Sequence, residues 1–113
     1  MISRNHKQNL TQFNEREKDN LARTIRQTVG MLDALYDKPF PYMMCMHQDP
    51  VNSGDFTNAY HFHIEFFPPM RSAVKQKFNA SSETGAWAHC NPTAPEEKAL
   101  ELKAAYQKFI SNG

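Results

Sequence analysis

This 113-residue sequence has little excess charge, no long apolar run and only two cysteines. Thirteen Lys and Arg against twelve Asp and Glu leave a net charge of +1, too little to attract nucleic acid or an anionic membrane. No apolar run approaches the ~20 residues that span a bilayer, and the first residues lack the apolar centre of a secretion signal. We therefore expect a cytoplasmic location, with neither a membrane nor nucleic acid as partner. Cys45 and Cys90 form neither a disulfide framework nor a CxxC metal motif, so both are expected to be reduced.

The length suits a single core, and no repeat, low-complexity run or linker divides the chain. Apolar residues recur every three or four positions from Leu21 to Leu35, which predicts an amphipathic helix over about residues 15–36. Asn14 and Glu17 form a capping-box pattern at its start, since each side chain can bond the other residue's backbone N–H.

Two strands are predicted after this helix. Residues 40–49 are mostly large and apolar, and residues 60–67 alternate with a period of two. Residues 50–59 are rich in turn formers, which favours an antiparallel hairpin. Pro68 and Pro69 end the second strand, because proline cannot donate to a ladder.

The rest of the chain completes an α+β pattern. Residues 73–78 are compatible with a short strand and residues 79–85 with a polar loop. Thr93 and Glu96 form a second capping-box pattern before a final helix. The order of elements predicts an α+β fold over a single domain, residues 1–113, with an antiparallel sheet flanked by helices.

The second strand carries three polar residues at every second position: His61, His63 and Glu65. Successive side chains of a strand point to opposite faces, so these three share one face while Phe62 and Ile64 face the core. The two imidazoles lie about 6 to 7 Å apart along the strand, so both can converge on one ligand.

His47 in the preceding strand can join them through the hairpin. Three imidazoles suit a divalent ion such as zinc or iron, with Asp49, Asp55 or Glu65 as acceptors for the second ring nitrogens. Two alternatives stay open on spacing alone. His63 could be a nucleophile towards a phosphate ester, in a nucleotide hydrolase or transferase, or the histidines could simply line the wet face of a sheet. With an ion bound, the chain could equally be a non-catalytic metal-binding module.

The motifs also resemble a known family. "HFHIEFF" is similar to the His-φ-His-φ-His-φ-φ signature of histidine triad proteins, where φ is apolar, with Glu65 in the third His position. Galactose-1-phosphate uridylyltransferases carry in their C-terminal half the order that is seen here as "FPYMMCMHQDP", "YHFHIEFFPPMRS" and "KFNASSETGAW". The resemblance covers nearly the whole chain. It implies a partial histidine-triad-like (HIT-like) fold and a homodimeric enzyme of galactose metabolism, the Leloir pathway, that transfers uridylyl from UDP-glucose to galactose-1-phosphate.

By position, the resemblance implies that His47, His61 and His63 hold a structural divalent ion, zinc or iron. Glu65 is expected to point further along the strand, leaving a water to complete the site.

The resemblance also implies a substrate loop. Lys77 and Phe78 match the start of a segment that reaches across the dimer to the sugar phosphate, and Lys suits phosphate as a mobile point charge. Glu83 matches the residue that contacts hexose hydroxyls. His89 stands where many relatives have a Gln that faces the sugar.

The family's nucleophile lies in a His-Pro-His motif of its first half, and this sequence contains no His-Pro-His. The resemblance therefore assigns no catalytic residue here. It implies a C-terminal repeat, truncated at its N-terminal edge, that needs the N-terminal half of the enzyme and is inactive alone.

Overall fold

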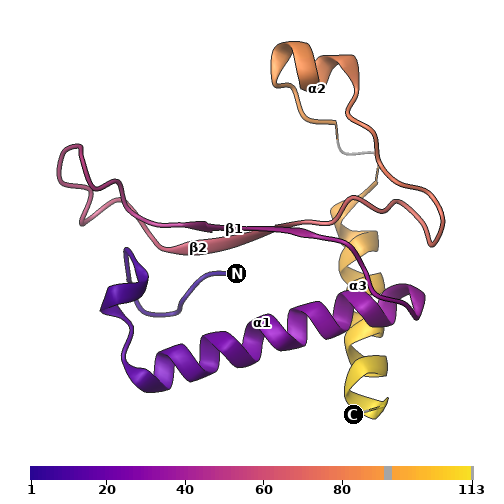
Figure 1. The fold of residues 1–113 in the computed structure, drawn as a ribbon, viewed down its shortest axis with the longest axis horizontal. Helices are drawn as coiled ribbons and strands as arrows, with labels where there is room; N and C mark the ends of the chain where they lie inside the picture. The colour runs from indigo at the N-terminus through magenta and orange to yellow at the C-terminus, as the bar shows by residue number, and fades with distance from the viewer. Residues whose placement is uncertain (91–92, 113) are drawn as a thin grey trace. The chain divides into compact units, whose positions relative to one another are not determined.

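The structure, a computed structural model, describes residues 1–90 and 93–112. Its elements are η1 (Leu10–Gln12), α1 (Glu15–Tyr36), β1 (Met43–His47), β2 (His63–Phe67), α2 (Ser81–Ala86) and α3 (Pro95–Asn112) (Figure 1). Helices combined with an antiparallel pair of strands confirm the predicted α+β class.

The chain divides into two compact units, and the boundary falls within α1. The first unit comprises Met1–Thr24 and Tyr42–Pro68, and the second comprises Ile25–Pro41 and Pro69–Gly113. The predicted single domain stays a prediction.

α1 begins at the predicted capping box. Asn14 Oδ1 accepts a hydrogen bond from the Glu17 backbone N–H at 2.9 Å, and the Glu17 carboxylate accepts from the Asn14 N–H at 3.0 Å. Lys7 Nζ lies 3.3 Å from the same carboxylate. The Asn14 N–H, followed by Asn5 and Lys7, lowers the pKa of Glu17. These contacts join the N-terminal segment to the start of the helix.

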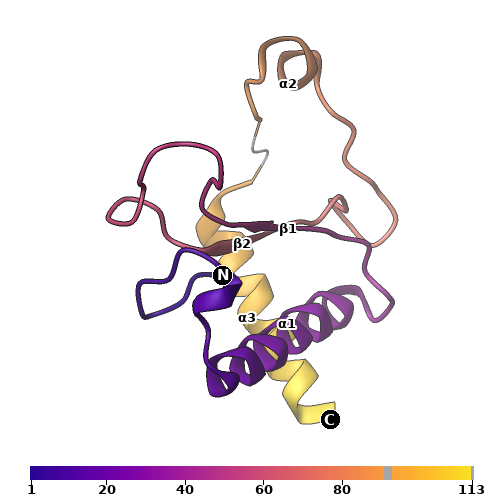
Figure 2. The same ribbon diagram turned by 60° about the vertical axis from the view of Figure 1, so that its left-hand side comes forward.

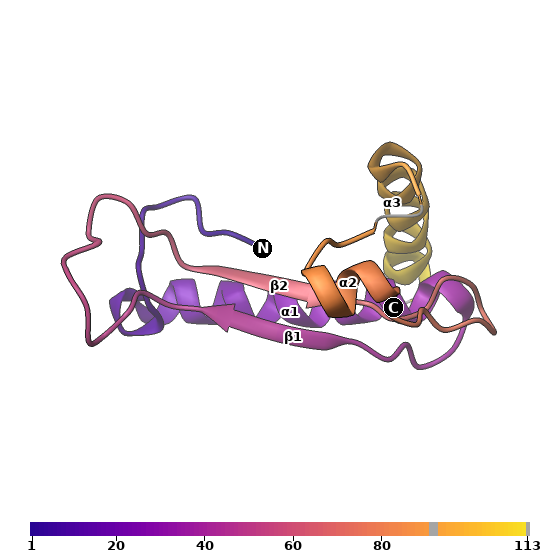
Figure 3. The same ribbon diagram turned by 90° about the horizontal axis from the view of Figure 1, so that it is seen from above.

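β1 and β2 form the hairpin of the first unit, seen face-on in Figure 3. Both predicted strands are confirmed, although each is shorter than expected. The register places Met43 opposite Phe67 and His47 opposite His63. Ile64 is fully buried, so one face of the hairpin belongs to the core and the opposite face carries the polar residues.

The N-terminal segment lies along the free edge of β2 (Figures 1 and 2). Ile2 forms an antiparallel bridge with His63, and the Ile64 N–H donates to the Met1 carbonyl at 2.8 Å. Further along, the Phe62 N–H donates to the Lys7 carbonyl at 2.6 Å. Residues before α1 are therefore held against the strand that carries the histidines.

In the second unit the later turns of α1 pack against α3 (Figure 2). The Phe109 ring lies over Gly30, and Lys108 Nζ lies 2.5 Å from the Asp37 carboxylate. Asp37 ends the helix in the left-handed region, with φ of 54°. The buried hydrophobic residues of this unit are Leu32, Phe40 and Ala105.

Two local predictions for residues 73–85 are wrong. The expected strand at 73–78 is reduced to a single bridge between Met70 and Gln76, and the expected loop at 79–85 contains helix α2. At the start of this short helix the Glu83 carboxylate accepts a hydrogen bond from the Ala80 N–H at 2.8 Å. Its sequence has no apolar periodicity that would have predicted a helix.

No helix within residues 1–90 and 93–112 is long and apolar enough to cross a bilayer. Cys45 and Cys90 are both free thiols.

Candidate metal centre and substrate loop

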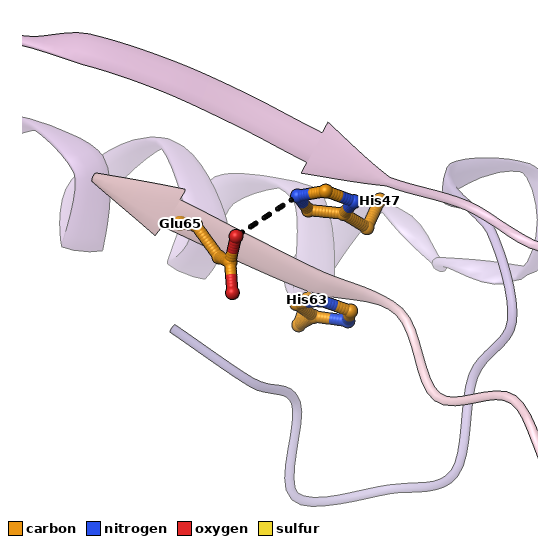
Figure 4. A group of neighbouring side chains, drawn as sticks. All are labelled: His47, His63 and Glu65. Atoms are coloured by element: carbon orange, nitrogen blue, oxygen red, sulfur yellow. Dashed lines mark ion pairs between the residues drawn. The ribbon is translucent and has the colours of Figure 1, made fainter. Parts of the chain in front are cut away.

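The polar face of the hairpin brings two imidazoles and one carboxylate together (Figure 4). Because His47 and His63 are directly opposite in the register, their rings stack with centroids 4.6 Å apart and an interplanar angle of 8°. Glu65 follows on β2, with Oε2 3.2 Å from His47 Nε2. Each of the three residues offers a ligand atom, and these atoms lie within 4.8 Å of one another.

The hydrogen bonds of this cluster leave one nitrogen of each of its two imidazoles free to bind a metal ion. His63 Nδ1 lies 3.0 Å from the His61 carbonyl. A carbonyl only accepts, so Nδ1 carries the proton, and the neutral ring then has its lone pair on Nε2. His47 Nε2 is buried and has no hydrogen-bond partner within residues 1–90 and 93–112, although Glu65 Oε2 lies 3.2 Å away. Buried polar atoms are normally paired, so this orphaned nitrogen is evidence that the residues fit a metal.

The chemistry of the three ligand atoms also fits a metal. Imidazole nitrogens with a carboxylate oxygen form a common set for zinc and for non-haem iron. The bond from His63 Nδ1–H to a backbone carbonyl is the outer contact that normally fixes a metal-binding imidazole. This arrangement can hold a divalent ion between the two strands.

His61, the remaining member of the predicted metal set, lies outside this cluster. Its Nε2 is 2.9 Å from Ser3 Oγ, and its ring meets that of His6 edge-on at a centroid distance of 5.1 Å. Sequence reasoning missed Ser3 and His6, because only the pairing of the N-terminal segment with β2 brings them here. The outcome for Glu65 also differs from expectation, since its carboxylate turns towards His47.

The acceptors expected from Asp49 and Asp55 are used elsewhere. Asp49 Oδ1 accepts from Asn9 Nδ2 at 2.9 Å. Asp55 accepts from the Thr57 side chain and backbone, which lowers its pKa. Instead, the backbone carbonyl of His61 accepts the hydrogen bond from the second ring nitrogen of His63.

The predicted substrate loop surrounds a buried carboxylate. Glu83 pairs with Lys77 Nζ and accepts from the backbone N–H groups of Ala80 at 2.8 Å and Cys90 at 3.1 Å. Only 3% of its side chain is exposed. Lys77, then the Ala80 and Cys90 N–H groups, hold the pKa of Glu83 at about 2. Glu83 therefore stays charged inside the loop.

The other predicted substrate residues lie on the surface of this loop. Phe78 is 82% exposed, and His89 is also exposed. Trp87 ends α2 in the left-handed region with φ of 54° and is 83% exposed. The loop thus combines a closed polar centre with aromatic side chains that no part of the described chain covers.

Comparison with known proteins gives one consistent result. Residues 1–105 match the family described as galactose-1-phosphate uridyl transferase, C-terminal domain. A galactose-1-phosphate uridylyltransferase of Thermotoga maritima is 43% identical over 98 residues, which is 87% of this chain and 31% of that protein. The Schizosaccharomyces pombe protein of the same name is 35% identical over 115 residues, covering 99% of this chain and 31% of its own length.

The fold agrees. A solved structure of a uridylyltransferase superposes with a TM-score of 0.84 at 34% identity, covering 95% of this chain and 33% of that one. The fold of this chain is thus HIT-like. This chain belongs to the galactose-1-phosphate uridyl transferase C-terminal domain family. It spans about a third of the length of the relatives it matches.

Proposed function

We propose that this chain is the C-terminal part of a UDP-glucose–hexose-1-phosphate uridylyltransferase, an enzyme of galactose metabolism. The observation that carries the proposal is the family match over residues 1–105, together with 43% identity to a relative named for this activity. The proposed substrates are UDP-glucose and galactose-1-phosphate. The proposed partners are a polypeptide with the N-terminal half of the enzyme and a second copy in a homodimer, in the cytoplasm.

The proposed division of labour follows from the residues present. Uridylyl transfer needs a nucleophile in line with the α-phosphate, and the His-Pro-His motif that supplies it in the family is absent from this sequence. The chain therefore provides a braced hairpin and a substrate loop. His63 is a poor alternative nucleophile, because a substrate phosphate approaching it would meet the negative charge of Glu65.

The brace is a divalent ion, zinc or iron, on the polar face of the hairpin. His47 and His63 would hold it through Nε2, since one of these atoms is orphaned and the other has a free lone pair. Bound there, the ion supplies a cross-link between β1 and β2 and has a structural role.

The substrate contacts proposed are Lys77, Phe78, Glu83 and His89. Lys77 is the cation available to a sugar phosphate. Glu83 receives three donors, from Lys77, Ala80 and Cys90, whereas a carboxylate can accept about four. One site therefore remains for a sugar hydroxyl without dismantling the loop.

The test is to rebuild activity from two polypeptides. The purified chain is assayed for UDP-galactose formation from UDP-glucose and galactose-1-phosphate, alone and after mixing with the N-terminal portion of the Thermotoga maritima relative. We expect no product from the chain alone and product from the mixture. The matched control is the same N-terminal portion with the histidines of its His-Pro-His motif changed to alanine, which should give none.

Two results would count against the proposal. Turnover by the chain alone would show that the nucleophile is here. A stable complex of the two polypeptides that forms no product would show that this chain does not complete the enzyme.

A further inference from the structure

The outer edge of the N-terminal segment lies beside a cavity of about 360 Å³. Resting on the two-polypeptide enzyme of the proposed function, we propose that this edge and this cavity together form the docking site for one β-strand of the N-terminal polypeptide. The added strand extends the sheet beyond residues 1–4 and places alternate apolar side chains in the cavity.

One side of the N-terminal segment is bonded to β2, and its other side is open. The Ile64 N–H donates to the Met1 carbonyl at 2.8 Å, and Ile2 lies opposite His63 in an antiparallel bridge. Backbone groups of successive residues in such a ladder point to opposite sides, so those of Ile2 point away from β2. Within residues 1–90 and 93–112, no group bonds to the N–H or the carbonyl of Ile2. An open edge of this kind is a template for another strand.

The cavity lies entirely within the first unit and has an apolar wall. Phe13, Phe62 and Ile64 line it together with Leu21 of α1. Residues 17, 20, 21 and 24 of the helix share one face by their spacing and form a second side. Residues 1–5 form a third side, so the cavity opens next to the unpaired backbone of Ile2.

The open edge and the cavity together favour a strand over a small molecule. A small molecule that fills the cavity leaves the backbone groups of Ile2 unpaired, whereas an extended chain satisfies both features at once. Recognition by strand addition takes its affinity from main-chain hydrogen bonds and its specificity from pockets for alternate side chains. Here one short segment offers both.

The N-terminal polypeptide fits this site better than a second copy of the chain. Arg4 is an exposed cation that lines the cavity, and no carboxylate within residues 1–90 and 93–112 forms an ion pair with it. A second copy would bring another Arg4 to an edge that already carries one, and like charges on neighbouring strands are destabilising. The expected strand therefore has alternating apolar residues and an acidic residue that meets Arg4.

The experiment measures the affinity of the purified chain for the N-terminal portion of the Thermotoga maritima relative, by isothermal titration calorimetry. Ile2→Pro removes an N–H that has no partner within the described residues, and proline is compatible with an edge strand. We expect it to weaken the complex about 10-fold or more, because a carbonyl of the added strand loses its donor. The matched control, Ile2→Ala, keeps the N–H and should bind nearly as tightly as the unaltered chain.

Two further pairs of variants test the cavity and the charge. Asn20→Trp places a large ring among the residues that line the cavity and should also weaken the complex, whereas Asp19→Trp adds the same ring to an exposed position outside the lining and should not. Arg4→Glu should weaken binding more than Arg23→Glu, which makes the same change of charge on α1 outside the lining. The urea midpoint of each variant alone identifies any that fails to fold.

Hydrogen exchange of the Ile2 amide, followed by NMR on labelled chain, locates the contact. We expect exchange to slow when the unlabelled N-terminal portion is added. Unchanged exchange in the complex, no complex at all, or full affinity for both Ile2→Pro and Asn20→Trp would overturn the docking site. Slow exchange in a homodimer of the chain alone would assign the edge to a second copy and overturn it too.

Failure of the proposed enzyme gives a different result. A complex that protects the Ile2 amide but forms no UDP-galactose supports this site and contradicts the enzyme. Undiminished UDP-galactose formation by Ile2→Pro and Asn20→Trp, mixed with the N-terminal portion at limiting concentration, supports the enzyme and overturns this site.

Discussion

Among single residues, the two polar clusters of the molecule differ in how completely they are paired. Glu83 meets an ammonium and two backbone N–H groups, whereas His47 Nε2 is covered and meets no donor or acceptor in hydrogen-bond geometry. Buried polar groups with hydrogen-bond partners stabilise local structure, and a buried polar group without one indicates a missing partner such as an ion. We infer that the first cluster orders the loop that carries the proposed substrate contacts, and that the second takes a ligand.

The paired cluster makes the loop around Glu83 sensitive to acid. The pKa of Glu83 falls from an ordinary 4.5 to about 2 in the folded chain, chiefly because of Lys77. A lowered folded-state pKa stabilises the folded form fully above pH 4.5, and this contribution is lost as pH falls from there to about 2. We expect Glu83→Gln to loosen the loop at neutral pH, and the difference from the unaltered chain to vanish near pH 2.

The sole tryptophan, Trp87, reports on this directly, because it ends α2. Its fluorescence anisotropy should be lower in Glu83→Gln than in the unaltered chain at neutral pH. Glu97→Gln serves as the matched control and should follow the unaltered chain. Equal anisotropy for Glu83→Gln and the unaltered chain at pH 7 would show that the ion pair does not order the loop.

Among helices and strands, elements whose own residues carry the signal were predictable, and elements that rely on contacts with other segments were not. α1, with its capping box at Asn14, follows from apolar spacing and two side chains. The last helix, Pro95–Asn112, was predicted likewise. α2 was missed because it is short and polar, and its stability comes from Lys77 and Cys90, which lie outside it.

The candidate site shows the same division. Alternation placed His61, His63 and Glu65 on one face, and the hairpin brought His47 to it. Which of these residues meet depends on the pairing register of β1 with β2 and on where the segment before α1 lies. The alternation of side chains does not fix the register, since a shift of two residues keeps every side chain on its face.

Packing between α1 and α3 gives a prediction at this scale. Alanine normally stabilises a helix interior by about 1 kcal/mol over glycine. At Gly30, however, the added Cβ would lie 2.3 Å from Phe109 Cε2. Since overpacking costs roughly 1–3 kcal/mol, we expect Gly30→Ala to lower the free energy of unfolding, measured in urea. In a Phe109→Ala background the same change should raise it. A stabilising Gly30→Ala with Phe109 in place would contradict this packing.

For the molecule as a whole, the amount of buried apolar surface is small. The buried hydrophobic residues of the described chain are Phe13, Leu32, Phe40, Phe62, Ile64 and Ala105. Met43 and Phe67, opposite one another on the hairpin, are 62% and 44% exposed. Relatives about three times as long contain this fold as one part. Both facts support a domain that works with further polypeptide, as proposed.

The measurement that tests the central claim most directly is an anomalous difference map from crystals of the chain grown with zinc and measured at the zinc absorption edge. We expect one peak about 2.0 to 2.2 Å from His47 Nε2 and His63 Nε2. No peak on this face of the hairpin would contradict the account.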